Sequence, residues 1–304
     1  MKSFVPWFCL VAATGSQCAY AVNGLDAYRQ GNYPLAAQAL ISQSGKDPVA
    51  DYYLGRMRLY GYGQVKNNSL ALRYFSQAAE KGILPAQQLL GRYYLLEDKN
   101  PEQALYWFKK AAEAGDTPAQ MYCAAAYLFG LGTKKNTDTA RRYFIDAAKN
   151  GNAIAQSTLG TYFLESRDQN SKKLGVIWLT KAATQGDINA QAKLGELYVN
   201  GTYVARDTAK GLELLVKAAA ENSYTAMVAL GELAIKQNQL STAKDWLTKA
   251  ANSNPHEVRA DLALARLYKE PKLLADPRMA FMWTEKAAQK GSPEAQQALA
   301  LMYK

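Results

Sequence analysis

The chain has 304 residues and a formal net charge of +10, with 36 lysine and arginine residues against 26 aspartate and glutamate residues. It contains one histidine, His256, and three cysteines. So few imidazole and thiol groups argue against zinc sites of the usual kind and against histidine-based catalytic triads. We therefore expect no cofactor, no metal and no enzymatic activity.

Residues 1–21 have the pattern of an export signal. Lys2 precedes an apolar stretch from Phe4 to Thr14, and Ala19 and Ala21 form the small-x-small pattern that precedes a cleavage point. We predict cleavage after Ala21 and a mature chain that is periplasmic or secreted. The apolar stretch is shorter than the roughly 20 residues that span a bilayer, and no later stretch is longer, so we expect no integral membrane span.

Removal of the signal also changes the cysteine content and the charge. Cys9 and Cys18 leave with it, so Cys123 stands alone and no intrachain disulfide can form. The net charge falls by one unit with Lys2 and stays strongly positive, which favours acidic partners. We expect anionic envelope polymers rather than nucleic acid among such partners, because exported proteins seldom meet nucleic acid.

Residues 22–47 precede the main repeats. They contain the string Tyr28-Arg-Gln-Gly-Asn-Tyr-Pro-Leu-Ala36, which resembles an ordinary tetratricopeptide unit. We predict that this N-terminal capping unit covers the exposed face of the first repeat.

From residue 48 onward, shifts of 33 to 36 residues bring one pattern into register, in which an alanine is followed four residues later by Leu-Gly. The anchors of the first helix in successive repeats are Ala50/Leu54/Gly55, Ala86/Leu90/Gly91, Ala119/Cys123/Ala124, Ala155/Leu159/Gly160, Ala190/Leu194/Gly195, Ala226/Leu230/Gly231, Ala260/Leu264/Ala265 and Ala295/Leu299/Ala300. The pattern predicts seven full repeats and one half repeat over residues 48–304.

The second helix of each repeat is equally regular. A small residue is followed three positions later by Tyr74, Trp107, Tyr143, Trp178, Leu214, Trp246 or Trp283. We predict that these side chains and Cys123 lie in the core, because aromatics that recur at one helical register are packing residues more often than carbohydrate-stacking surfaces. The helix should end where a residue adopts the left-handed conformation, at Gly82, Gly115, Gly151, Gly186, Asn222, Asn254 and Gly291.

Strings such as Ala50-Asp-Tyr-Tyr-Leu-Gly and Ala71-Leu-Arg-Tyr-Phe-Ser-Gln-Ala-Ala-Glu-Lys-Gly resemble the Sel-one-like repeat, a slightly longer relative of the tetratricopeptide repeat. The resemblance implies an all-α fold, a right-handed α-solenoid, and a non-catalytic protein–protein interaction scaffold or adaptor. The chain departs from the family in the loop between the two helices. Glycine loops occur at Gly61 to Gly63, at Gly130 to Gly132 and in part at Gly201, and other repeats have polar connections.

After the seventh repeat, residues 293–303 form a single predicted helix. We expect it to seal the apolar side of the solenoid as a C-terminal cap, since repeat arrays need polar ends. The alternative is that this helix docks a partner or a second copy of the chain.

The resemblance also implies that residues two before and two after each repeat leucine point into a concave groove. The candidate partner-binding residues are Tyr52, Arg56, Tyr60, Gln88, Arg92, Glu196, Glu232 and Arg266. Arg56 and Arg92 with their flanking tyrosines are suited to clamp a peptide carboxylate or an acidic polymer, because guanidinium offers paired donors to carboxylate oxygens. The alternative is that both arginines are solvated groove residues, paired to Asp51 or Glu97.

Glu196 and Glu232 occupy equivalent positions in adjacent repeats, about 10 Å apart by helix-packing distances, which resembles the carboxylate separation of inverting glycosidases. Nothing in the surrounding sequence would raise the pKa of one of them, so we interpret the spacing as coincidence. Two functions stay open: an adaptor that holds a protein or peptide in its groove, and a binder of an anionic envelope polymer such as peptidoglycan or an exopolysaccharide. As the salt concentration rises, polymer binding through distributed charge should weaken more steeply than binding of a peptide held in the groove.

Overall fold

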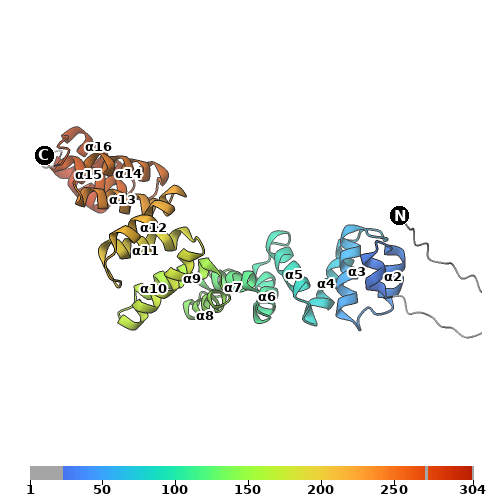
Figure 1. Ribbon diagram of the computed structural model, residues 1–304. Helices are drawn as coiled ribbons and strands as arrows, with labels where there is room; N and C mark the ends of the chain where they lie inside the picture. Colours follow the sequence, from blue (N-terminus) through green and yellow to red (C-terminus); the bar gives the residue numbers. More distant parts are fainter. Residues whose placement is uncertain (1–22, 271–272, 303–304) are drawn as a thin grey trace, which may run out of the picture. The chain divides into compact units, whose positions relative to one another are not determined.

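The computed structural model describes residues 23–270 and 273–302. The described part of the chain forms seventeen α-helices and contains no strand, which confirms the predicted all-α class (Figure 1). The predicted signal at residues 1–21 lies outside the described residues. Among the helices that are described, none is both long enough and apolar enough to cross a membrane.

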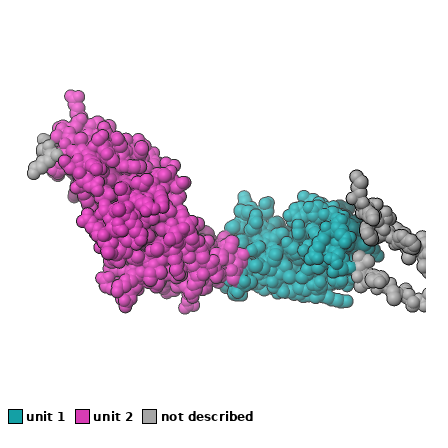
Figure 2. Space-filling model, in the orientation of Figure 1, with its two compact units in different colours: residues 1–114 teal, residues 115–304 magenta. Residues whose placement is uncertain are grey.

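The chain divides into two compact units, residues 1–114 and residues 115–304 (Figure 2). The helices of unit 1 are α1 (Gly24–Arg29), α2 (Tyr33–Ile41), α3 (Pro48–Tyr60), α4 (Asn68–Glu80), α5 (Leu84–Leu96) and α6 (Pro101–Glu113). Those of unit 2 are α7 (Thr117–Phe129), α8 (Thr137–Lys149), α9 (Ala153–Leu164), α10 (Gln169–Thr184), α11 (Ile188–Asn200), α12 (Thr208–Ala220), α13 (Tyr224–Lys236), α14 (Leu240–Ser253), α15 (Arg259–Lys269), α16 (Pro277–Gln289) and α17 (Pro293–Met302).

Short polar side chains start the helices. Asn100 precedes α6 and accepts a hydrogen bond from the backbone N–H of Gln103 at 3.1 Å, and Asp116 does the same for Ala119 at 2.9 Å. These oxygens satisfy N–H groups that have no partner within the first turn of a helix. Pro101 follows Asn100 at the first helical position, where its missing N–H costs nothing.

Most of the predicted helix ends are confirmed, and one is wrong. Glycines after the second helices have φ between +88° and +91°, and Asn222 has φ +61°. Asn254 instead has φ −136°, in the extended region. The next residue is Pro255, whose ring disfavours helical conformations of the residue before it, so Asn254 is held extended.

The two helices of a repeat approach each other most closely at the glycine that follows the repeat leucine. A Cβ placed on Gly55 would lie 2.8 Å from the Phe75 ring, and one on Gly91 would lie 2.8 Å from the Phe108 ring. Phe75 is fully buried. In these repeats the second helix therefore contacts the first through the residue four positions after its small residue. The sequence pattern had pointed to the aromatic residue one position earlier.

Those aromatics lie at the edge of the core. Trp107 and Trp283 are buried, whereas Trp178 and Trp246 are only half-buried. A lysine three residues later lies over each indole ring, at 4.6 to 5.7 Å from the ring centroid. The prediction that the tryptophans are core is thus correct for two of the four. Cys123 is buried, as predicted.

Neighbouring repeats are joined by a recurring glutamine. The side-chain amide of Gln87 on α5 donates to the carbonyl of Ala79 near the end of α4 at 3.0 Å, and Gln156 on α9 donates to Ala148 on α8 at 3.0 Å. Both glutamines are buried. Each bond adds a second donor to a carbonyl in the last turn of a helix, which also accepts from the backbone N–H of Gly82 or Gly151.

The end segments pack on their neighbours. Ala27 of α1 and Leu40 of α2 share one hydrophobic cluster with Leu54 and Met57 of α3. At the other end α17 packs on α16 and buries Ala295. The assignment of residues 22–47 and 293–303 as caps stays a prediction.

We predict that Gly91→Ala lowers the free energy of unfolding by about 1–2 kcal/mol. The new Cβ would overlap the Phe108 ring, and the free-energy cost of that overlap exceeds the gain in helix propensity. Urea denaturation followed by circular dichroism measures the change. In a Phe108→Ala background the same substitution should cost nothing, since the ring is gone. An equal cost in both backgrounds would show that the contact is not the cause.

Candidate functional site

A groove in unit 1 is lined by side chains of α3, α4 and α5. Its volume is about 610 Å³. Four of the predicted partner-binding residues line it, namely Tyr52, Tyr60, Gln88 and Arg92. Leu59, Leu72 and Leu89 supply its apolar surface. With Tyr93 the groove thus combines an apolar floor with one guanidinium group and three phenol rings, a combination typical of sites that bind peptides or small molecules.

Arg92 is exposed, and its guanidinium group makes no hydrogen bond or ion pair with any residue that the structure describes. Glu97 lines the same groove without pairing to it. The alternative in which Glu97 neutralises Arg92 is therefore wrong within the described chain. All five N–H donors of Arg92 are available to a ligand.

Arg56 lies beside the groove rather than in its lining. Its guanidinium carbon is 5.7 Å from the Tyr28 ring centroid and 6.0 Å from that of Tyr52. These cation–π contacts leave the edge of the guanidinium free, and it makes no ion pair within residues 23–270 and 273–302. Burial raises the pKa of the Tyr28 hydroxyl, against the opposing effect of the Arg56 charge, so Tyr28 stays neutral.

Asp51 cannot neutralise Arg56. Its side chain is fully buried and accepts hydrogen bonds from the Ser44 hydroxyl at 2.8 Å and the Gly45 N–H at 3.0 Å. The carboxylate therefore ties the segment before α3 to that helix. The sequence suggested Asp51 as a partner because it is close to Arg56 along the chain, but the two side chains leave α3 on different sides.

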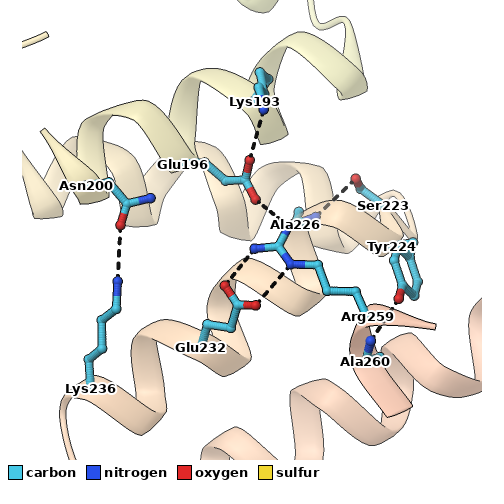
Figure 3. Close-up of polar contacts among 10 residues, drawn as sticks. All are labelled: Lys193, Glu196, Asn200, Ser223, Tyr224, Ala226, Glu232, Lys236, Arg259 and Ala260. Atoms are coloured by element: carbon cyan, nitrogen blue, oxygen red, sulfur yellow. Dashed lines mark hydrogen bonds and ion pairs between the residues drawn. The ribbon is translucent and has the colours of Figure 1, made fainter. Parts of the chain in front are cut away.

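In unit 2 the predicted groove residues Glu196, Glu232 and Arg266 all form ion pairs. Arg259, at the start of α15, donates to both carboxylate oxygens of Glu232 at 3.0 and 2.6 Å and to Glu196 at 3.1 Å (Figure 3). Lys193 lies 3.6 Å from the other oxygen of Glu196. Arg266 pairs with Glu294 at 2.7 Å. The acidic and basic groove positions of unit 2 are therefore largely neutralised.

Sequence reasoning missed Arg259. Burial lowers its pKa, but the hydrogen bonds and charges of Glu232 and Glu196 outweigh this, and the net effect is a raised pKa. The signal was present in the repeat register. Arg259 and Glu294 both directly precede a repeat alanine, and both pair with the residue two after the leucine of the preceding repeat, Glu232 and Arg266.

This register rule also accounts for the free guanidinium of Arg56. Arg56 is two after its repeat leucine, and the residue that directly precedes the next repeat alanine is Pro85. A proline offers no charge, so the contact that neutralises Glu232 and Arg266 in unit 2 has no counterpart at Arg56. The two units thus present different chemistry from the same repeat positions.

Comparison with known proteins identifies the repeats. A model of the family described as Sel1 repeat matches residues 48–83, 84–116, 117–152, 153–187, 188–223, 226–255 and 258–292. The chain belongs to the Sel1 repeat family. The seven matched segments confirm the seven full repeats and the resemblance inferred from the residues. Sel1 repeat proteins are generally scaffolds that bind protein partners, and they are typically non-catalytic.

Individual relatives share the fold over much of this chain. A protective antigen of uropathogenic Escherichia coli strains, with the same type of repeat fold, is 25% identical with a TM-score of 0.70, covering 92% of this chain and 62% of that one. A Sel1 repeat protein from Oxalobacter formigenes is 26% identical with a TM-score of 0.51, covering 77% of this chain and 100% of that one. These neighbours support the solenoid architecture.

Among proteins of known role, the chitin synthase regulator SKT5 of Saccharomyces cerevisiae is 27% identical over 270 residues, which are 79% of this chain and 38% of that protein. The Sel1 repeat chain therefore spans less than two thirds of this regulator and of the Escherichia coli antigen. The similarity to both proteins lies in the repeats, and the roles of their remaining parts are not carried over to this chain.

We predict that Arg259→Gln lowers the free energy of unfolding by about 1 kcal/mol at low salt, because it breaks a two-pronged guanidinium–carboxylate contact that is partly exposed. The loss should shrink in about 1 M NaCl through screening. Urea titrations at both salt concentrations measure it. The matched control is Lys217→Gln, which breaks the exposed contact to Glu213 and should cost less than Arg259→Gln, because fully solvated ion pairs contribute little. Equal losses for the two variants would contradict the prediction.

Proposed function

We propose that this Sel1 repeat chain is a non-catalytic adaptor that holds an acidic segment of a protein partner in the groove of unit 1. The observation that carries the proposal is the state of the arginines. Arg56 and Arg92 have no ion pair among the described residues, whereas Arg259 and Arg266 are each bound to a glutamate. Arg92 is exposed and Arg56 is half-buried. A solvent-accessible guanidinium without an ion pair at an apolar groove is available for a partner's carboxylate.

The apolar floor supports a peptide rather than a free ion. Leu59 and Leu89 lie in the same groove as Arg92, and Tyr60 at its edge is 56% exposed. A partner segment that places an apolar side chain on this floor can bring a neighbouring carboxylate to Arg92. Burial of that side chain would contribute affinity, and the charge pair would select the sequence.

We further propose that the adaptor acts in the bacterial envelope or outside the cell. The support is the sequence pattern alone, with Lys2, the apolar stretch that follows it, and the small residues Ala19 and Ala21. Binding of peptidoglycan or an anionic exopolysaccharide remains the alternative activity, because unpaired arginines attract polymer carboxylates as well as peptide carboxylates.

The partner-binding proposal is tested by crosslinking in the chain's own cells. A photoreactive amino acid at Tyr60 should capture a protein, and Arg56→Glu with Arg92→Glu should reduce the captured amount by at least about tenfold, because two attractive contacts become repulsive. The matched control is Arg73→Glu with Lys109→Glu, which changes the charge equally and alters residues of α4 and α6 that do not line the groove.

Two results would contradict this proposal. One is capture that is unaffected by the groove substitutions or equally reduced by the control pair. The other is binding of the purified chain to isolated cell-wall polymer that falls steeply between about 50 and 500 mM NaCl while no protein is captured, which would favour the polymer alternative.

The export proposal has its own test. Mass spectrometry of the protein isolated from its own cells should give an N-terminus at Val22, and Ala19→Arg with Ala21→Arg should leave the longer form, since signal peptidase needs small residues there. Recovery of an uncleaved chain from the cytoplasm of unmodified cells would show that the proposed location is wrong.

A further inference from the structure

A second hollow, in unit 2, is lined by side chains of α9, α11 and the loop that follows α11. It consists of two adjoining cavities of about 330 and 420 Å³, which share Thr161 and Glu165 in their lining. Glu196, Lys193 and Asn200, all shown in Figure 3, lie on the α11 side of it. The hollow is separate from the groove of unit 1.

The lining of this hollow is polar and carries both kinds of hydrogen-bonding group: Lys193, Asn189 and Asn200 supply N–H donors, and threonine and glutamate oxygens supply acceptors. The hydroxyl of Thr158 donates to the carbonyl of Ile154 at 2.8 Å, and that of Thr161 donates to Ser157 at 3.1 Å. Their remaining lone pairs are therefore acceptors. Glu165 is exposed and makes no ion pair with the described part of the chain, so its carboxylate adds two further acceptor oxygens.

Two exposed tyrosines contribute rings to this lining. Tyr162 is 46% exposed and Tyr203 is 41% exposed. Tyr162 is held in place by Arg141, which donates to its hydroxyl at 2.7 Å. Arg141 lies over one face of the Tyr162 ring, 5.3 Å from its centroid, and Lys172 lies over one face of the Tyr203 ring at 4.9 Å. The exposed remainder of each ring offers apolar surface next to hydrogen-bonding groups.

Tyr203 also has an unfavourable backbone conformation. Its φ is +62°, in the left-handed region that residues with a large side chain rarely adopt. The corresponding positions of the first and third repeats are Gly63 and Gly132, with φ +62° and +67°. The fifth repeat therefore has a tyrosine where the fold favours glycine, and that tyrosine stays 41% exposed.

We propose that this hollow binds a neutral oligosaccharide, with Tyr203 and Tyr162 stacking on sugar rings and Glu165 accepting hydrogen bonds from sugar hydroxyls. Sugar hydroxyl groups both donate and accept hydrogen bonds, which matches a lining with both donors and acceptors, and the C–H faces of sugar rings match exposed phenol rings. An anionic polymer is disfavoured, because Glu165 is uncompensated and Lys193 is engaged with Glu196. A basic peptide is the competing occupant that the test must separate.

The test is calorimetric titration of the purified full chain with cellohexaose, maltohexaose and the hexamer of N-acetylglucosamine, and with hexalysine as the basic peptide. At least one sugar should bind with a dissociation constant near about 1 mM or tighter. Tyr203→Asn and Glu165→Gln should each weaken it by about tenfold. Because asparagine tolerates the left-handed conformation, Tyr203→Asn should also keep or raise the melting temperature.

The matched control is Tyr106→Asn, which removes an exposed tyrosine of α6 that lines neither this hollow nor the groove of unit 1 and should leave sugar binding unchanged. The proposal is overturned if no sugar binds, if hexalysine binds more tightly than every sugar, or if Tyr106→Asn rather than Tyr203→Asn abolishes binding. If Tyr203→Asn lowers the melting temperature, the result for Glu165→Gln decides, since that exposed side chain has no fold contact to lose.

Discussion

In five of the seven full repeats the helical pair is held at the distance at which a glycine backbone touches a large side chain. Gly55 meets Phe75, Gly91 meets Phe108 and Gly231 meets Leu247, in each case with no space for a Cβ. This contact sets how far apart the paired helices lie and which residues of the first helix face outward. The position of Arg92 follows from it, because Arg92 lies on the same helix directly after Gly91.

The fold could be predicted because the same core pattern recurs many times along the sequence, with Ala, Leu and Gly in the same register. Local chemistry was harder to read where one residue overrode the pattern, as Pro255 does at Asn254. The site was harder still. Arg259 reaches Glu196 across 63 residues of chain. A pairing of that kind depends on the rotation of one helix relative to another two repeats away, which composition and spacing do not contain.

The same repeat positions give the two units different surfaces. In unit 2 the residue before each of the last two repeat alanines, Arg259 or Glu294, neutralises a charge on the preceding repeat, and the resulting pairs link consecutive first helices. In unit 1 the equivalent residue beside Arg56 is Pro85, and the guanidinium remains free. The residue at this one position thus decides whether the charge on the preceding repeat is paired within the described chain. Repeats of one architecture can present different surface charges in this way.

The glutamines that join neighbouring repeats constrain how such a chain can change length. Gln87 and Gln156 bond to carbonyls at the end of the preceding helix, so the turns between them, residues 81–83 and 150–152, must keep their three-residue span. The connections inside the repeats have no such bond and vary, from residues 237–239 to residues 61–67. Insertions and deletions should therefore accumulate in the connections inside the repeats, such as the one that contains Tyr203, and in turns between repeats that lack the glutamine bond. The turn at residues 254–258, before the seventh repeat, is longer than three residues, and Asp261 there takes the position of the glutamine.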